Sequence, residues 1–465
     1  MGQSYSQPPR GYLYSQINYK RGEKGKNIIE RQNPDYESDL IQFNNFQSLF
    51  LNNFEYEQNI VCFQEFNGSR NVSYGQVYEI LQAGYSKLQA SYKQGTTAGV
   101  YAHSTNETFL IFCLLLLAGI PIFPVTPSRE GSDFKNFIKG CEENNVSLIF
   151  CDPCEEKRLS SSLPTCSIYP IVSKYFQSST KSSFPEVDSN SPAFIYCSHN
   201  NGNNDNNDNN YNILSQSECL CGLSAWSHRL KISRDSTIHN ISNIDSGTYR
   251  LICILSIFNR ATLSPISIVT DSRSKPPTVQ YINIKNNNNN KIQFNPSTHV
   301  FLGHDQFNEL SEFTTKSLEN LGFFSRFLYS EISFQSKIGI IPPNTYNYLF
   351  NFKESNQNFN SLKENFGIFS ETKFIFIDKS IPAKEHENLS LMLLKPISII
   401  FVPPEWGNNG AALPCDFRFT KYGTVGGPVV SPIQWNQEQN SLMVNGNDKI
   451  INGSYDEEGS LIILS

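Results

Sequence analysis

Apolar residues recur at two different spacings along the chain, and the two spacings predict two kinds of element. Over residues 72–92 they recur at every third or fourth position, which is typical of one face of an amphipathic helix. The apolar stripe consists of Val77, Ile80, Leu81, Tyr85 and Leu88. Ser73 precedes the stripe and is a suitable N-cap residue, so the pattern predicts a helix that begins there and packs one face against a core.

Similar helical segments alternate with short apolar runs that are typical of strands. Besides 72–92, helices are expected at 39–54, 109–120, 134–146 and 307–329. Strands are expected at 59–66, 97–104, 120–125, 147–152, 193–198, 250–258, 298–303, 372–378 and 397–403. This alternation predicts an α/β fold with largely parallel sheets.

The strongest apolar run covers residues 109–120, and it is followed by Pro121. A helix that crosses a bilayer needs about 20 apolar residues, and this run is shorter. Gly119 and Pro121 mark its end before the next apolar strand. The run is therefore expected to be a buried helix of a folded core.

Two asparagine-rich tracts interrupt the pattern and help to divide the chain. They have too little apolar content to pack, so both are expected to be surface loops. The boundaries that follow are an extended N-terminal arm at 1–40, a first α/β subdomain at 41–200, an Asn-rich loop at 201–212, a second α/β subdomain at 213–412 with an Asn-rich insertion near 286–290, and a small β-rich subdomain at 413–465.

Charge and composition exclude some classes of protein. The formal net charge of −6 gives no electrostatic reason for nucleic acid to be the main partner. The 34 phenylalanines and 22 tyrosines supply enough apolar surface for a packed core, which argues against a disordered chain. At 465 residues the chain is long enough for two or three domains.

The 11 cysteines are odd in number and follow an N-terminus without the apolar stretch of a signal peptide, which predicts reduced thiols on the cytoplasmic side. Cys151 and Cys154 form a C-x-x-C pair, but a second pair with metal-site spacing is missing from the sequence. Gly2 and Ser6 match the N-myristoylation pattern. One acyl chain would give reversible membrane binding, with peripheral contact to the endoplasmic reticulum or another membrane.

Three short motifs follow one another within residues 72–128: a Gly-Val-Tyr strand at 99–101, an Ala-Gly helix end at 118–119 and a turn from Pro124 to Thr126. With these motifs the segment resembles the adenylate-forming acyl-CoA synthetases, especially the long-chain fatty acid branch. It implies two stacked α/β subdomains with a small β-rich piece near the C-terminus. It also implies ATP- and Mg²⁺-dependent activation of a long-chain fatty acid to acyl-AMP, followed by transfer to CoA.

The phosphate loop of that family aligns with the stretch that begins at Tyr196. Tyr196, Ser198 and Gly202 are retained, but both threonines are replaced and the lysine falls on or near Asp205. Because a carboxylate repels a triphosphate, the resemblance predicts a poor ATP cradle.

Two further motifs of the family are reduced. A Gly-x-Val-Gly-x-Pro-like motif is present at 423–428, and counting back from it places Glu405 on the Mg²⁺-binding glutamate, without the tyrosine, glycine and threonine that accompany it in the family. The ribose-binding aspartate falls on Ser465, so the mobile C-terminal domain of the family is expected to be lacking.

Three hypotheses follow from the sequence. The first is a fatty acid–CoA ligase-like protein that is weakly active or inactive, a pseudoenzyme. The second is a non-catalytic acyl- or nucleotide-binding protein, or a scaffold that pairs with an active synthetase at a membrane. The third is a remnant without a stable function. A serine hydrolase is disfavoured, because "GLSAW" at 222–226 lacks the second glycine of a nucleophile elbow.

Overall fold

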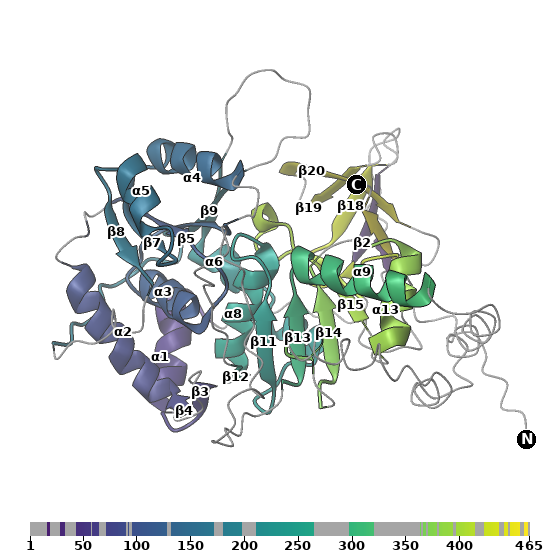
Figure 1. Ribbon diagram of the computed structural model, residues 1–465, viewed down its shortest axis with the longest axis horizontal. Helices are drawn as coiled ribbons and strands as arrows, with labels where there is room; N and C mark the ends of the chain where they lie inside the picture. Colours follow the sequence, from purple (N-terminus) through teal and green to yellow (C-terminus); the bar gives the residue numbers. More distant parts are fainter. Residues whose placement is uncertain are drawn as a thin grey trace, which may run out of the picture.

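The structure is a computed structural model, and it contains two large sheets with helices between and outside them (Figure 1). It describes residues 16–18, 28–32, 43–56, 58–64, 71–89, 92, 95–127, 132–171, 180–197, 211–264, 297–319, 363, 366–368, 371–378, 381–393, 397–413, 423–436, 441–444, 447–455 and 460–463. Gly2, Ser198, Gly202, Ser465, the second Asn-rich tract and most of the first lie outside the described residues.

The first sheet is mainly parallel. Within the described residues its strand order is β10-β9-β6-β5-β7-β8, and only β10 runs antiparallel to its neighbour. The strands are β5 (Thr97–Tyr101), β6 (Ile122–Val125), β7 (Val146–Cys151), β8 (Ser167–Pro170), β9 (Pro192–Cys197) and β10 (Tyr211–Ser215). Successive side chains of β7 face opposite sides, so Leu148 and Ile149 belong to different cores.

The second sheet is also mainly parallel and carries the order β17-β16-β15-β14-β13-β11-β12-β3-β4 among the described strands. Its parallel strands are β3 (Val61–Gln64), β11 (Thr237–Ile241), β12 (Thr262–Leu263), β13 (His299–Leu302), β14 (Phe374–Ile377) and β15 (Ile397–Phe401). Antiparallel strands at its two ends are β4 (Asn71–Ser73), β16 (Ala411–Ala412) and β17 (Gly427–Pro428).

Helices cover both faces of these sheets, and two of them join the sheets into one core. The helices are α1 (Phe46–Tyr56), α2 (Tyr74–Leu88), α3 (Asn106–Leu117), α4 (Ser132–Glu143), α5 (Glu156–Ser162), α6 (Gln216–Leu220), α7 (Leu223–Leu230), α8 (Gly247–Asn259), α9 (His304–Glu319) and α13 (Ala383–Leu393). The ring of Phe112 on α3 meets that of Tyr249 on α8 edge-on, with centroids 5.4 Å apart. This shared core holds the two sheets at a fixed position relative to each other.

Two sequence predictions about helices are confirmed. Ser73 caps α2 through a capping box with Gln76, and Val77 and Leu81 of the predicted stripe are fully buried. Residues 109–117 of the apolar run lie in α3, where every residue except Glu107 is buried, and the helix ends just before Gly119. Among the described helices, none combines the length and the apolarity that a membrane span requires.

The strand predicted at 250–258 is wrong, because this segment belongs to helix α8. Ser246 accepts a hydrogen bond from the backbone N–H of Tyr249, which caps the helix, and Arg260 ends it in a left-handed conformation with φ 57°. All residues from Gly247 to Ile257 are buried. A helix that is buried on all sides has no amphipathic period, so its apolar run resembles that of a central strand.

A third, antiparallel sheet forms the small β-rich piece, and it includes strands from the N-terminal arm. Its order is β1-β2-β18-β19-β20-β21 among the described strands. These are β1 (Gln16–Asn18), β2 (Ile28–Gln32), β18 (Ile433–Asn436), β19 (Ser441–Val444), β20 (Asn447–Tyr455) and β21 (Leu461–Ile463). Figure 1 shows purple β2 beside yellow-green β18, and Arg31 lies opposite Ile433 in their register. No pattern in the sequence predicted this pairing.

Candidate functional site

The carboxyl ends of strands from both large sheets meet at one cavity of about 530 Å³. Strands β6 and β9 reach it from the first sheet, and β11, β13, β14 and β15 reach it from the second. Its described lining is Phe123, Pro124, Val125, Asp133, Asn136, Tyr196, Cys197, Asn243, Asp245, Ser246, Gly303, Asp378, Phe401, Pro403, Pro404, Glu405 and Ile451. Crevices at the carboxyl ends of parallel strands are the usual ligand sites of open α/β sheets.

Two residues that the sequence singled out line this cavity together. Tyr196 lies at the end of β9, and Glu405 lies in the short 3₁₀ helix η3 (Pro404–Trp406) that follows β15. They come from different sheets, so only the packing of the two sheets brings them to one site. Ser198 and Gly202 lie outside the described residues, and their place relative to the cavity stays a prediction.

The described lining is strongly acidic. Four of its residues are acidic, namely Asp133, Asp245, Asp378 and Glu405, and none of the described lining residues is lysine, arginine or histidine. We call this cavity, with the lining given above, the acidic cleft. No group of three or more His, Cys, Asp or Glu side chains among the described residues is close enough to hold a metal ion. A Mg²⁺ site at Glu405 therefore stays a prediction from the resemblance.

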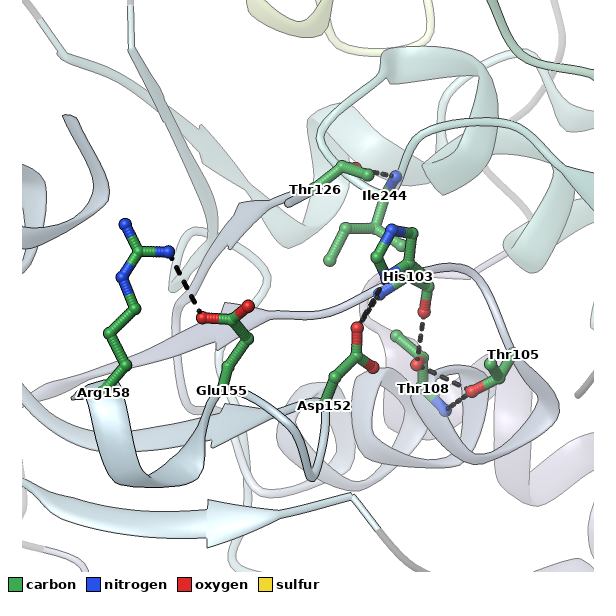
Figure 2. A network of polar contacts seen from close by, with 8 residues as sticks. All are labelled: His103, Thr105, Thr108, Thr126, Asp152, Glu155, Arg158 and Ile244. Atoms are coloured by element: carbon green, nitrogen blue, oxygen red, sulfur yellow. Dashed lines mark hydrogen bonds and ion pairs between the residues drawn. The ribbon is translucent and has the colours of Figure 1, made fainter. Parts of the chain in front are cut away.

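Asp245 is held in the cleft by a threonine of the other sheet. The Thr126 hydroxyl, just after β6, donates to Asp245 Oδ1 at 2.7 Å and accepts the backbone N–H of Ile244 at 2.8 Å. Figure 2 shows the contact between Thr126 and Ile244. Burial raises the pKa of Asp245, and the Thr126 hydroxyl opposes this by stabilising the carboxylate.

Asp378 directly follows β14 and lies in a similar environment. The Thr248 hydroxyl on α8 donates to Asp378 Oδ1 at 2.7 Å. Burial raises the pKa of Asp378 to about 6, the hydroxyls of Thr248 and Ser246 oppose the rise, and the charge of Asp245 adds to it. The two aspartates thus make the cleft costly for any further negative charge.

Arg250 contacts both Tyr196 and the turn that carries Glu405, but it is not among the described residues that line the cleft. It is fully buried on α8, and its guanidinium donates to the carbonyl of Pro404 at 3.0 Å and to that of Gly407. Its guanidinium carbon lies 5.2 Å from the centre of the Tyr196 ring. Arg250 therefore holds the η3 turn against β9. Its hydrogen bonds are made to the backbone of this turn, outside the cleft.

The phenol of Tyr196 is a buried polar group without a partner. The side chain is 4% exposed, and its Oη has no hydrogen-bond partner in the part of the chain that the structure describes. Burial raises the pKa of Tyr196, and the nearby guanidinium of Arg250 opposes the rise. The phenol therefore stays protonated and is able to donate or accept one hydrogen bond within the cleft.

A histidine–aspartate pair lies near the cleft but not in its lining. His103 follows β5, and its Nδ1 lies 2.6 Å from Oδ2 of buried Asp152, which also accepts the His103 backbone N–H at 3.1 Å (Figure 2). Thr108 donates its hydroxyl to the His103 carbonyl at 2.8 Å. Among the described residues no hydroxyl or thiol bonds to Nε2, so the pair ties the ends of β5 and β7 rather than forming a nucleophilic triad.

The sequence missed the residues that give the cleft its charge. Asp378 stands immediately after an apolar strand, and Asp245 stands four residues after another. A polar residue just beyond the end of a parallel strand is a recognisable signal, because all such ends meet at one edge of the sheet. Arg250 fell within the strand that was wrongly predicted at 250–258. A charged residue at the start of an apolar run is itself a sign that its side chain makes specific buried hydrogen bonds.

Known structures share this fold at low sequence identity. The chain matches VinN with a TM-score of 0.57 and 10% identity, over 92% of this chain and 100% of that one. It matches ATP-bound MatB from Rhodopseudomonas palustris with a TM-score of 0.55 and 11% identity, over 90% and 78%. It matches the nonribosomal peptide synthetase FmoA3, bound to AMPPNP, with a TM-score of 0.58 and 10% identity, over 93% and 43%.

The chain has the fold of the N-terminal domain of adenylate-forming enzymes. The predicted α/β architecture with two stacked subdomains and a small β-rich piece is therefore confirmed. No family model matches the sequence, and no curated protein matches it either. At 10–12% identity the likeness concerns the fold alone, and the assignment to the long-chain fatty acid branch stays a prediction.

Proposed function

We propose that this chain is a ligand-binding protein with the adenylate-forming fold, in which ATP-dependent formation of an acyl-adenylate is impaired. The observation that carries the proposal is the charge of the acidic cleft, whose described lining has four acidic residues and no basic one. The cleft is of the size that small molecules occupy in proteins. The described lining does not fit the triphosphate of ATP, because both are negatively charged.

Electrostatics argues against nucleotide chemistry at this site. Two like charges about 4 Å apart repel by about 4 kcal/mol under the screening typical of sites near a protein surface. Transfer of a nucleotidyl group relies on cations that stabilise the charge that develops in the transition state. Arg250 is a buried cation close to the described part of the site. Two nitrogens of its guanidinium already donate to the backbone carbonyls of Pro404 and Gly407.

The second candidate is the function that the resemblance implies, activation of a long-chain fatty acid with ATP and Mg²⁺ and its transfer to CoA. Its support is that Tyr196 and Glu405, which the resemblance assigns to the nucleotide site, line one cleft. The ATP-bound state of the similar structure MatB is consistent with it. In this candidate Glu405 would hold Mg²⁺, and Tyr196 would stand at the start of the phosphate loop.

Pyrophosphate release separates the two candidates. The purified chain is incubated with ATP, Mg²⁺ and palmitate, and both pyrophosphate and palmitoyl-AMP are measured. We expect no palmitoyl-AMP above the level of a reaction without protein, because the cleft repels the triphosphate.

The Glu405→Gln variant is the control for this experiment. Fatty-acid-dependent pyrophosphate release by the natural chain that is lost in Glu405→Gln would overturn the proposed function and establish the second candidate. Pyrophosphate release that is equal in the natural chain and in Glu405→Gln would be assigned to a contaminating enzyme and not to this chain.

A further inference from the structure

The acidic side chains of the cleft do not converge on one point. A site for a single metal ion needs several carboxylates within reach of one position, and no such group exists among the described residues. The carboxylates of Asp245 and Asp378 instead belong to loops after different strands, β11 and β14, and each is oriented by its own threonine. The negative charge is therefore distributed along the cleft.

Each of these two aspartates has acceptor capacity left for a ligand. The Thr126 hydroxyl donates to Oδ1 of Asp245, and the hydroxyls of Thr248 and Ser246 stabilise the carboxylate of Asp378. A carboxylate can accept about four hydrogen bonds, so these donors do not saturate either group. Both carboxylates are half-buried, and no basic side chain of the described lining compensates their charge. Such a pair is stabilised by a ligand that brings positive charge with hydrogen-bond donors.

The rest of the described wall is mixed, with apolar side chains beside the amides of Asn136 and Asn243, the Ser246 hydroxyl and one buried phenol. Phe123, Val125 and Phe401 are part of the lining, and they provide surface for methylene groups between charged positions. The Tyr196 phenol, 4% exposed and without a partner, supplies a further acceptor or donor inside the cleft. An unpartnered buried hydroxyl costs free energy unless a ligand satisfies it, and it is independent of the aspartates as evidence for a bound molecule.

We propose that the acidic cleft binds an oligoamine, a molecule with two or more ammonium groups separated by methylene carbons. The ammonium groups donate to the carboxylates of Asp245 and Asp378, and the methylene carbons pack against the side chains of Phe123 and Phe401. A cavity of about 530 Å³ exceeds what such a chain of a few carbons needs, so the ligand enters with some water. The inference rests on one part of the proposed function, namely that the acidic cleft is a ligand site.

Isothermal titration with spermidine tests the proposal, with n-butylamine as the probe that carries a single ammonium group. We expect one saturable site on the full chain, with spermidine binding at least tenfold more tightly than n-butylamine, because a second ammonium adds a second charge-assisted hydrogen bond. Equal affinity for the two amines would overturn the proposal.

Three variants locate the site. Asp245→Asn and Asp378→Asn keep the shape and the threonine hydrogen bond, and each is expected to weaken spermidine binding about tenfold. Tyr196→Phe keeps the ring over Arg250 and is expected to weaken it severalfold. Asp235→Asn removes a charge from an exposed position and is the matched control, expected to leave the affinity unchanged. Near-ultraviolet circular dichroism checks that each variant is folded.

An acidic protein also attracts amines diffusely, and the control variant separates this case. Binding that weakens equally in Asp235→Asn and in the cleft variants, or that never saturates, would overturn the oligoamine site. Palmitoyl-AMP formation in the earlier experiment would overturn the proposed function while saturable spermidine binding still stood. Absence of both palmitoyl-AMP and spermidine binding would overturn the oligoamine proposal alone.

Discussion

Asp378 illustrates how much the properties of a residue depend on its position at the end of a strand. It follows the apolar strand β14 directly, so its carboxylate lies at the rim of the sheet, next to α8. There it loses most of its contact with water, and its pKa rises to about 6. The hydroxyls of Thr248 and Ser246 compensate only part of this cost, because two hydroxyls replace several water molecules.

Stability measurements between pH 4 and pH 8 test this position. Because the folded protein holds the Asp378 proton up to about pH 6 and the unfolded chain releases it near pH 4, the natural chain is expected to lose stability as the pH rises from 4 to 6. Asp378→Asn removes this titration. The variant is therefore expected to be more stable than the natural chain at pH 8, by about 2 kcal/mol, in urea denaturation.

The Asp235→Asn variant is again the reference, since its carboxyl group is exposed. If Asp378→Asn shows the same pH profile as the natural chain, the carboxylate of Asp378 is not desolvated. A variant that is less stable than the natural chain at pH 8 would likewise contradict the buried-carboxylate interpretation.

At the scale of elements, helix α8 links most parts of the site. It contributes Thr248 to Asp378, Tyr249 to the core with α3, and Arg250 to the turn that carries Glu405. These three consecutive residues point in three directions because successive positions on a helix are about 100° apart. One short segment therefore couples the second sheet, the first sheet and the η3 turn.

Replacing Arg250 tests this coupling. Arg250→Met fills a similar volume but leaves the carbonyls of Pro404 and Gly407 without donors, so we expect a loss of about 3 kcal/mol in the free energy of unfolding. Arg250→Lys keeps one charged donor and is expected to lose less. Tryptophan fluorescence of Trp406, in the same turn, reports whether η3 shifts.

A smaller loss in Arg250→Met than in Arg250→Lys would contradict the role of Arg250 as a donor to this turn. In that case the side chain would contribute through its volume and its contact with the Tyr196 ring rather than through hydrogen bonds.

At the scale of the whole molecule, segments far apart in the sequence complete each other's sheets. Strands β3 and β4 extend the second sheet although they precede the first sheet in the chain. Strands β1 and β2 from the N-terminal arm extend the third sheet, because β2 pairs with β18 and β1 pairs with β2. The acidic cleft depends on the same long-range order, since its lining extends from Phe123 to Ile451.

Deletion of residues 1–32 tests the contribution of the arm. It removes the backbone partners that β2 provides on one side of β18 and leaves those of β19, so hydrogen exchange at the amides of Ile433–Asn436 that face β2 is expected to become at least tenfold faster. Exchange in β5 and β6 of the first sheet is expected to stay unchanged. Unchanged exchange in β18 would show that β2 does not stabilise the third sheet in solution.

The sequence alone determined the local structure wherever the burial was one-sided. The stripe of α2, its serine cap and the alternation of helices and strands follow from spacing and hydrogen-bonding chemistry that act within a few residues. The α/β class followed from that alternation. Tyr196 and Glu405 were singled out as candidate site residues because they align with motifs of the family that the sequence resembles. The same reasoning failed at α8, because burial on every side removes the period that distinguishes a helix from a strand.

Only the tertiary structure decided what the site is. The sequence places Asp245, Asp378 and Glu405 far apart, and no local rule says that their strands end at one cavity. Strand order is set by the packing of whole sheets against shared helices, which involves contacts across hundreds of residues. The charge of a cleft is a sum over such neighbours, so it exists only once the sheets are assembled.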